Sequence, residues 1–248
     1  MKKLAITLIG LVALVSCNKE SGVLNDAESI QLNGKVKSVV EVTTYENSEE
    51  RKITTTFLFN EKGYFTEITH TSAAAYGTDT IKTSTKRVFD YKNDNVVEIT
   101  DADDNGREQK FIKKTDDKGR ILELKTDSSD EGGYTITYSY TNGGKEATIT
   151  AVTALRKEEL KEKVTFDEKG RVLTEISQGR DGKITDKTTY KYNDKGYLEE
   201  VIREFGGVNQ KRVEQFKYKY DAKGSAVTRE LYTNGEKINT SQRTIEYY

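Results

Sequence analysis

The sequence contains no proline and no tryptophan, and its 248 residues include one cysteine and one histidine. Because Cys17 is alone, the chain cannot form an internal disulfide. His70 has no Gly-x-Ser-x-Gly nucleophile motif beside it, so we interpret it as a solvated residue at the end of a strand. The sequence also lacks a Cys/His cluster with metal-ligand spacing and a glycine-rich phosphate loop. These absences predict a domain without cofactor, metal or catalytic residues.

The charge is balanced: Lys and Arg total 40 and Asp and Glu total 41, a formal net charge of −1. Nucleic-acid binding requires a basic surface, so nucleic acid is not an expected partner. Hydrophobic residues make up 34% of the chain, and the mean hydropathy is −0.77. That apolar share is thin, but 15 tyrosines and 8 phenylalanines recur at regular places. We therefore expect an ordered fold with a shallow core and a solvated surface.

The N-terminus has the three parts of an export signal. Lys2 and Lys3 form a positive segment, and residues 4–15 are uncharged but fewer than the 20 or so that a transmembrane helix needs. The sequence Leu14-Val15-Ser16-Cys17 resembles the lipobox of bacterial lipoprotein signal peptides. The resemblance implies a diacylglycerol on the sulfur of Cys17 and cleavage between Ser16 and Cys17. The alternative is an ordinary secretory signal in which Cys17 is incidental.

These features divide the chain into three parts. Residues 1–16 are interpreted as a signal peptide, residues 17–32 as the lipidated cysteine and a polar tether, and residues 33–248 as one β-domain. The membrane is then a partner through the lipid anchor, since two or three acyl chains hold a protein firmly. Asn18 is the residue after the cysteine. By resemblance to known sorting rules, an asparagine at this position favours the outer membrane. Exposure on the periplasmic or the outer side stays open.

A short turn pattern repeats along the chain: an aromatic residue, then Asp or Asn, then one variable residue, then Lys-Gly. The glycines of the later copies, Gly144, Gly170, Gly196 and Gly224, stand 26, 26 and 28 residues apart, which fits two strands and two connections. Asp or Asn opens such a turn through side-chain hydrogen bonds, and Gly takes the positive φ. The copies are residues 59–65, 115–121, 166–172, 192–198 and 220–226, with degenerate ones at 91–97 and 140–144.

The segments between the turns alternate between apolar and polar residues. Phe216, Tyr218 and Tyr220 share one face while Lys217 and Lys219 share the other, as expected for a sheet with one wet side. Every connection is too short for a helical crossover, so neighbouring strands must be antiparallel. We predict an all-β, antiparallel up-and-down meander of about 15–17 strands, curled into a soluble barrel-like sheet. An open, elongated single-layer sheet is the alternative.

The turn pattern resembles the YD/RHS repeat, with residues 166–172 and 220–226 nearest to it. Together with the lipobox, it resembles uncharacterised bacterial lipoproteins with a porin-like β-barrel. Lys before Gly, and Tyr or Ser after it, depart from the usual repeat. The resemblance therefore implies an architecture rather than an activity.

Few residues are candidates for chemistry. Residues Asp101–Gly106 match the first half of a calcium loop, but Ile112 stands where the bidentate Glu is needed, so we interpret them as a hairpin loop. The carboxylate pairs Asp116/Asp117 and Glu199/Glu200 belong to the repeat, which already explains them. Tyrosine rows such as Tyr190/Tyr192 and Tyr218/Tyr220 are expected to face the core, with stacking on sugars or peptides as the alternative.

The sequence thus predicts a monomeric, membrane-anchored envelope lipoprotein, a non-enzymatic binding or structural module of unknown ligand, for which a glycan or a protein is a candidate. The alternative is a glycan- or peptide-processing enzyme with carboxylates gathered at one edge of the sheet. A transmembrane pore is disfavoured because the strands expose Lys, Glu and Thr where a lipid-facing band needs apolar residues.

Overall fold

The computed structural model describes residues 25–248 apart from residues 77–78, 127–132, 154–158, 180 and 207–209. Within this part the chain forms sixteen strands, one short helix and one 3-10 turn. In chain order they are α1 (Asp26–Ser29), β1 (Val36–Tyr45), β2 (Ser48–Phe59), β3 (Phe65–Tyr76), β4 (Asp79–Asn93), β5 (Val96–Asp103), β6 (Glu108–Thr115), β7 (Ile121–Thr126), β8 (Tyr134–Thr141), η3 (Asn142–Gly144), β9 (Glu146–Thr153), β10 (Glu159–Phe166), β11 (Val172–Gln178), β12 (Ile184–Tyr192), β13 (Leu198–Phe205), β14 (Gln210–Tyr220), β15 (Ala226–Thr233) and β16 (Glu236–Tyr247).

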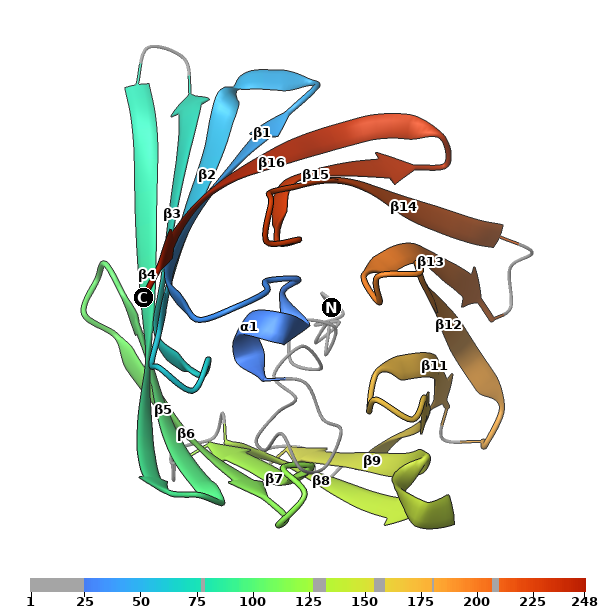
Figure 1. Ribbon diagram of the computed structural model, residues 1–248. Coiled ribbons are helices and arrows are strands. Elements are labelled where there is room, and N and C mark those ends of the chain that lie inside the picture. Colours follow the sequence, from blue (N-terminus) through green and yellow to red (C-terminus); the bar gives the residue numbers. More distant parts are fainter. Residues whose placement is uncertain (1–24, 77–78, 127–132, 154–158, 180, 207–209) are drawn as a thin grey trace.

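The strands form a closed barrel (Figure 1). Each strand pairs antiparallel with its neighbours in the chain, and β16 closes the ring by pairing with β1 from Val36↔Tyr247 to Tyr45↔Asn239. The predicted antiparallel meander and its strand number are confirmed, and the open-sheet alternative is wrong. Closure pairs the backbone groups that two free edges would have left exposed.

The connections alternate between the two ends of the barrel, and the predicted repeat turns share one of them, the repeat-turn end. In the β2–β3 turn the carboxamide oxygen of Asn60 accepts from the backbone N–H groups of Lys62 and Tyr64, at 3.0 and 3.1 Å. Gly63 takes a φ of +83°. Equivalent bonds form at Asp116, Asp167, Asn193 and Asp221, so the predicted turn mechanism is confirmed.

Apolar side chains fill the barrel on one side. The inward faces from β1 to β11 carry a continuous core in which the rings of Phe59 and Phe89 lie 5.1 and 5.6 Å from that of Phe65. Its other buried members include Val39, Ile99, Phe111, Leu124, Ile136, Ile149 and Val164. The inward faces from β12 to β16 contribute no residue to this buried set, although side chains such as Tyr190 pack against it. The core is therefore lopsided, and apolar side chains of β13 and β14 such as Leu198, Val201 and Phe216 border a lumen instead of joining this cluster.

A short N-terminal segment, residues 25–33 (the α1 segment), lies inside the ring of strands (Figure 1). Asn25 caps α1 through a reciprocal capping box with Glu28. Asp26, Ala27 and Leu32 are 2%, 2% and 1% exposed. The predicted tether therefore ends earlier than residue 32, because Ala27 and Leu32 pack in the core.

Polar contacts hold the α1 segment to the barrel at two places. On the β2–β4 side the Asp26 carboxylate accepts from the Phe65 N–H at 2.8 Å, and the Ala27 N–H donates to Gly63 O at 3.0 Å. At the β14–β15 turn, four strands round the ring from β3, the Asn33 N–H donates to Ser225 Oγ at 2.8 Å. The segment crosses the repeat-turn end and forms one wall of the remaining lumen.

We expect Gly63→Ala to destabilise the domain more than Gly106→Ala. Both glycines have a positive φ, +83° and +74°, and alanine there costs about 1–2 kcal/mol. A Cβ at Gly63 would also lie 2.9 Å from the Asn25 side chain, whereas a Cβ at Gly106 meets nothing within 4 Å. Urea unfolding of both variants measures the difference in the free energy of unfolding. Equal losses would show that the close approach of the new methyl group to Asn25 adds no cost of its own.

Candidate functional site

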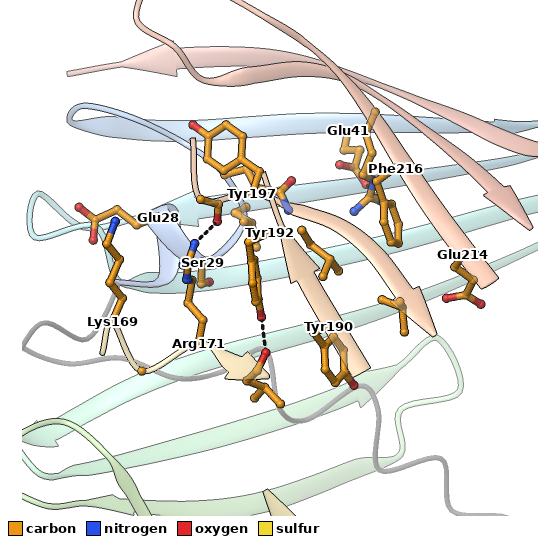
Figure 2. A pocket seen from close by; sticks show the side chains of 18 of the residues that line it. Glu28, Ser29, Glu41, Lys169, Arg171, Tyr190, Tyr192, Tyr197, Glu214 and Phe216 are labelled. Carbon is orange, nitrogen blue, oxygen red and sulfur yellow. Dashed lines mark hydrogen bonds and ion pairs between the residues drawn. The ribbon is translucent and has the colours of Figure 1, made fainter. Parts of the chain in front are cut away.

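A cavity of about 500 Å³ lies inside the barrel, between the α1 segment and strands β11–β15. Ile30 and Gln31 line it on one side, and inward side chains of β12, β13 and β14 line it on the other. It reaches the repeat-turn end at Gly170 and Gly196. Figure 2 shows aromatic and charged side chains converging on this space. Its volume falls within the range of small-molecule sites, roughly 300–1,000 Å³.

Tyrosine rings form the wall on the β12–β13 side. Tyr190 and Tyr192 lie on either side of the exposed Lys191 in β12. Because successive side chains of a strand point to opposite faces, both tyrosine rings point inward. The Tyr192 hydroxyl donates to Val172 O, and the Tyr197 hydroxyl donates to Gly224 O, each at 2.8 Å. Burial raises the pKa of Tyr192 to about 12. The backbone thus holds these two hydroxyls, the Tyr192 and Tyr197 rings border the cavity, and Tyr190 both borders it and packs against the core.

The arginine of the repeat turn braces this wall. The Arg171 guanidinium lies 4.3 Å from the centroid of the Tyr192 ring and forms two 2.6 Å bonds with the Asp167 carboxylate. It also donates to Gly196 O at 2.9 Å, which Figure 2 marks. Since Asp167 balances its charge, Arg171 serves the turn and the wall.

One buried carboxylate joins β1, β15 and β16. Glu41 lies 2.6 Å from Arg243 Nε and 3.3 Å from Arg229 Nη2, and we call these three residues the first triad. Arg243, whose side chain is 3% exposed, also donates to Ile30 O at 2.7 Å and so ties the α1 segment to the barrel. Burial alone would raise the pKa of Glu41, but Arg229 and Arg243 together hold it below its usual value. Burial lowers the pKa of Arg243.

A second triad lies on β13 and β14. Glu214 Oε1 is 2.8 Å from Arg212 Nη2, and Glu214 Oε2 is 3.5 Å from Arg203 Nη2. The strand register places Val201 opposite Glu214 and Arg203 opposite Arg212, so all four lie on the inward face. Each triad therefore contains two guanidinium groups and one carboxylate.

Two buried polar atoms near the second triad have no hydrogen-bond partner among the described residues: Arg203 Nε and Glu175 Oε1. The other oxygen of Glu175 accepts from the Tyr190 hydroxyl at 2.7 Å. The register aligns Glu175, Thr188 and Arg203 in one row across β11, β12 and β13. Burial raises the pKa of Glu175, and the charge of nearby Glu162 raises it further. Buried side-chain atoms without a partner are uncommon in folded proteins.

The structure separates most of the residues that the sequence singled out. Ser16 and Cys17 lie outside the described residues. His70 lies within β3 rather than at a strand end, because that strand continues to Tyr76; its Nδ1 lies 3.0 Å from Thr55 Oγ1.

The loop compared with a calcium site uses its carboxylates within the fold. Asp101 forms two 2.6 Å bonds with Arg87 of β4, and Asp103 Oδ1 accepts from the N–H groups of Asn105 and Arg107. Over the described ranges, no group of three or more His, Cys, Asp or Glu side chains is arranged to hold a metal ion.

Carboxylates at the repeat-turn end and in the cavity also have partners. At the repeat-turn end, Asp116 and Asp221 accept from the backbone of their own turns. In the cavity, Glu41 and Glu214 face arginines, and Glu28 accepts from the Asn25 N–H. Each of the three carboxylates among the described lining residues therefore contacts an N–H group or an arginine. None of the described helices is long and apolar enough to span a membrane.

Sequence reasoning missed the two triads. A signal was present in the alternation of the strands. Glu41 shares its face of the strand with Val39 and Thr43, which are buried, and Glu214 shares its face with Phe216. A charge on the apolar phase indicates a buried ion pair, but the partner strand becomes known only when the barrel closes.

The chain is similar in fold to a porin-like protein from Bacteroides uniformis, with a TM-score of 0.59 and 15% identity over 86% of this chain and 99% of that one. A porin-like protein from Bacteroides vulgatus and an outer membrane lipoprotein-sorting protein domain from Vibrio parahaemolyticus match at TM-scores of 0.26 and 0.20, each with 12% identity over 86% of this chain and over 98% and 86% of theirs. No family model and no curated protein matches the chain, so the YD/RHS resemblance stays a prediction.

Proposed function

We propose that this protein is an exported lipoprotein of the outer membrane, anchored through Cys17, whose barrel binds a ligand in its lumen without transforming it. The observation that carries the binding role is the cavity of about 500 Å³ between the α1 segment and β11–β15. The porin-like barrel of similar fold is consistent with a place in the cell envelope. A glycan unit or a protein segment is the ligand class that the tyrosine rows suggested.

The outward face supports a barrel that stands beside the bilayer rather than within it. Ion pairs join neighbouring strands there: Lys86–Glu67 at 2.8 Å, Lys114–Glu123 at 2.9 Å and Lys191–Glu200 at 2.7 Å. A lysine on a lipid-facing barrel surface costs about 2–4 kcal/mol near the bilayer midplane. A lipid anchor is therefore the means by which the proposal joins this surface to a membrane.

The position of Asn25 sets how far the barrel can stand from that anchor. Asn25 lies against Gly63 at the repeat-turn end, eight residues after Cys17. Eight extended residues span at most about 29 Å. In the proposed arrangement the repeat-turn end therefore stays close to the membrane, and the opposite end points away.

The test of the proposal is Cys17→Ser in the full chain, expressed in a Gram-negative host. We expect wild type to incorporate labelled palmitate and to sediment with membranes, because acyl chains supply the attachment. The variant should incorporate no label and appear in the aqueous fraction with an unchanged thermal melt. If the folded variant, with residues 1–16 removed, stayed in the membrane after carbonate extraction, the barrel itself would be the membrane-bound part and the proposal would be wrong.

A further inference from the structure

Apolar groups make up most of the cavity wall beside β11–β14. Val172, Leu198, Val201 and Phe216 line the cavity there, and Ile30 lines it from the α1 segment. The rings of three tyrosines complete this surface (Figure 2). A ligand that covers the wall therefore gains most by burying apolar surface of its own.

The tyrosines of this wall have no hydroxyl proton left for a ligand. The hydroxyl groups of Tyr190, Tyr192 and Tyr197 each donate to an oxygen of the protein, at 2.7, 2.8 and 2.8 Å. A saccharide brings many hydroxyls, and each one that is buried without a partner costs free energy. The tyrosines therefore present carbon surface, which suits a hydrocarbon chain better than a glycan.

The length of the apolar wall follows from β13. Gly196 borders the cavity at the repeat-turn end, and Val201 lies five residues further along the chain. Five residues span at most about 17 Å. At and beyond Val201 the lining becomes charged, because Glu214 pairs opposite Val201 and Arg203 follows it. An extended hydrocarbon chain advances about 1.3 Å per carbon, so about 13 carbons cover the apolar stretch.

The mouth of the cavity is polar and faces the membrane in the proposed arrangement. Glu28, Ser29 and Lys169 border it, and Figure 2 shows the Glu28 and Lys169 side chains at this end. Both signs of charge are thus available to a head group that stays in water. Since eight residues separate Cys17 from Asn25, this end stays near the bilayer, and a lipid chain has a short path from the bilayer to the cavity.

We propose that the lumen binds one acyl chain of a membrane lipid, which enters at the repeat-turn end. The chain lies along Val172, Leu198 and Val201, and its head group stays at the mouth beside Glu28 and Lys169. Transfer from the bilayer costs little, because each methylene exchanges one apolar environment for another. The inference rests on the proposed function, both for the lumen as the binding site and for the end that faces the membrane.

The experiment is a calorimetric titration with single-chain lipids of increasing length. The protein is residues 17–248 carrying Cys17→Ser, so that neither the predicted signal peptide nor an acyl group of the protein competes. The probes are octyl, decyl, dodecyl, tetradecyl and hexadecyl phosphocholine, each below its micelle concentration, with glycerophosphocholine and chitobiose as probes without a chain. We expect affinity to rise about tenfold for each added pair of methylenes and to stop rising at about the tetradecyl chain. The two probes without a chain should not bind measurably.

Variants at two depths locate the chain. Leu198→Trp, nearer the mouth, should weaken binding of every probe with a chain about tenfold or more. Val201→Trp, at the deep end, should leave octyl phosphocholine binding unchanged and stop the rise in affinity at a shorter chain. General destabilisation would not move the length at which the rise stops, and thermal melts verify that each variant is folded.

Ile202→Trp is the matched control. Ile202 follows Val201 in β13, and because successive side chains point to opposite faces, it points outward. The control variant should therefore give the same affinity as the parent protein for every probe.

Three outcomes would overturn the inference. Affinity that does not depend on chain length, or binding of chitobiose alone, would leave a ligand-binding barrel without an acyl ligand. A series unchanged by both Leu198→Trp and Val201→Trp would place the chain outside the lumen. No binding of any probe would reject the acyl ligand, while the fractionation of Cys17→Ser decides separately whether the protein is an anchored lipoprotein.

Discussion

Removing Gln242–Tyr248 abolishes the cooperative unfolding transition of the domain; this is the largest effect that we expect from any change described here. The deletion takes away six of the nine residue pairs between β16 and β1, from Val36↔Tyr247 to Val42↔Gln242. It exposes Val39, which is 0% exposed in the closed barrel, and leaves two long unpaired edges. Circular dichroism during heating measures the result.

The same deletion removes contacts that reach beyond the strand pair. The Tyr247 hydroxyl donates to the Asp221 carboxylate at 2.6 Å and lies 2.9 Å from Ser225 Oγ. Glu246→Gln is the control, because Glu246 lies on the outward face and pairs with the exposed Lys37. It should melt like wild type. A deleted chain with an unchanged melting temperature would contradict the view that closure holds the fold together.

Glu41→Gln destabilises the barrel by roughly 3–5 kcal/mol at neutral pH, the cost of leaving a buried charge without its partner. The substitution keeps the shape of the side chain but leaves Arg243, 3% exposed, without a counter-charge. Denaturation by urea measures the loss. Glu200→Gln on the outward face, where Lys191 is its partner, should change stability little.

The loss caused by Glu41→Gln should depend on pH. The pKa of Glu41 is lower in the fold than in the unfolded chain, so its contribution is present above the unfolded value near 4.5 and declines as the pH falls toward the folded value. The difference between wild type and variant should therefore shrink in acid. A difference that stayed constant from neutral pH into acid would show that the carboxylate charge is not the cause.

A double variant distinguishes lost pairing from a general defect at this position. Replacing Arg243 by Met in the Glu41→Gln background removes the uncompensated charge and should restore part of the stability, despite the loss of the bond to Ile30 O. Losses that simply add would mean that Glu41 and Arg243 do not interact as the 2.6 Å contact indicates.

Much of the fold was predictable because its causes are local. The Asp or Asn and the Gly of each repeat turn determine the turn through contacts within five residues, as at Asn60–Tyr64. Two-residue alternation, as in Phe216–Tyr220, determines which side chains share a face. Short connections then require antiparallel neighbours, and together these features specify the meander.

The cavity and its ion pairs were not predictable, because they depend on residues far apart in the chain. Glu41 and Arg243 are 202 positions apart and meet only because β16 pairs with β1. The α1 segment reads as a polar tether, yet Ala27 and Leu32 are buried inside the barrel. No local pattern indicates that a four-residue helix will enter a lumen.

The sequence by itself therefore determined the turns, the strand phase and the expected anchor at Cys17, since each depends on neighbouring residues. Only the tertiary structure decided that the sheet closes, that its core fills one side, and that two arginine-rich triads face the space left on the other. The reason is geometric: closure brings the first and last strands together, and what lies between them depends on all sixteen.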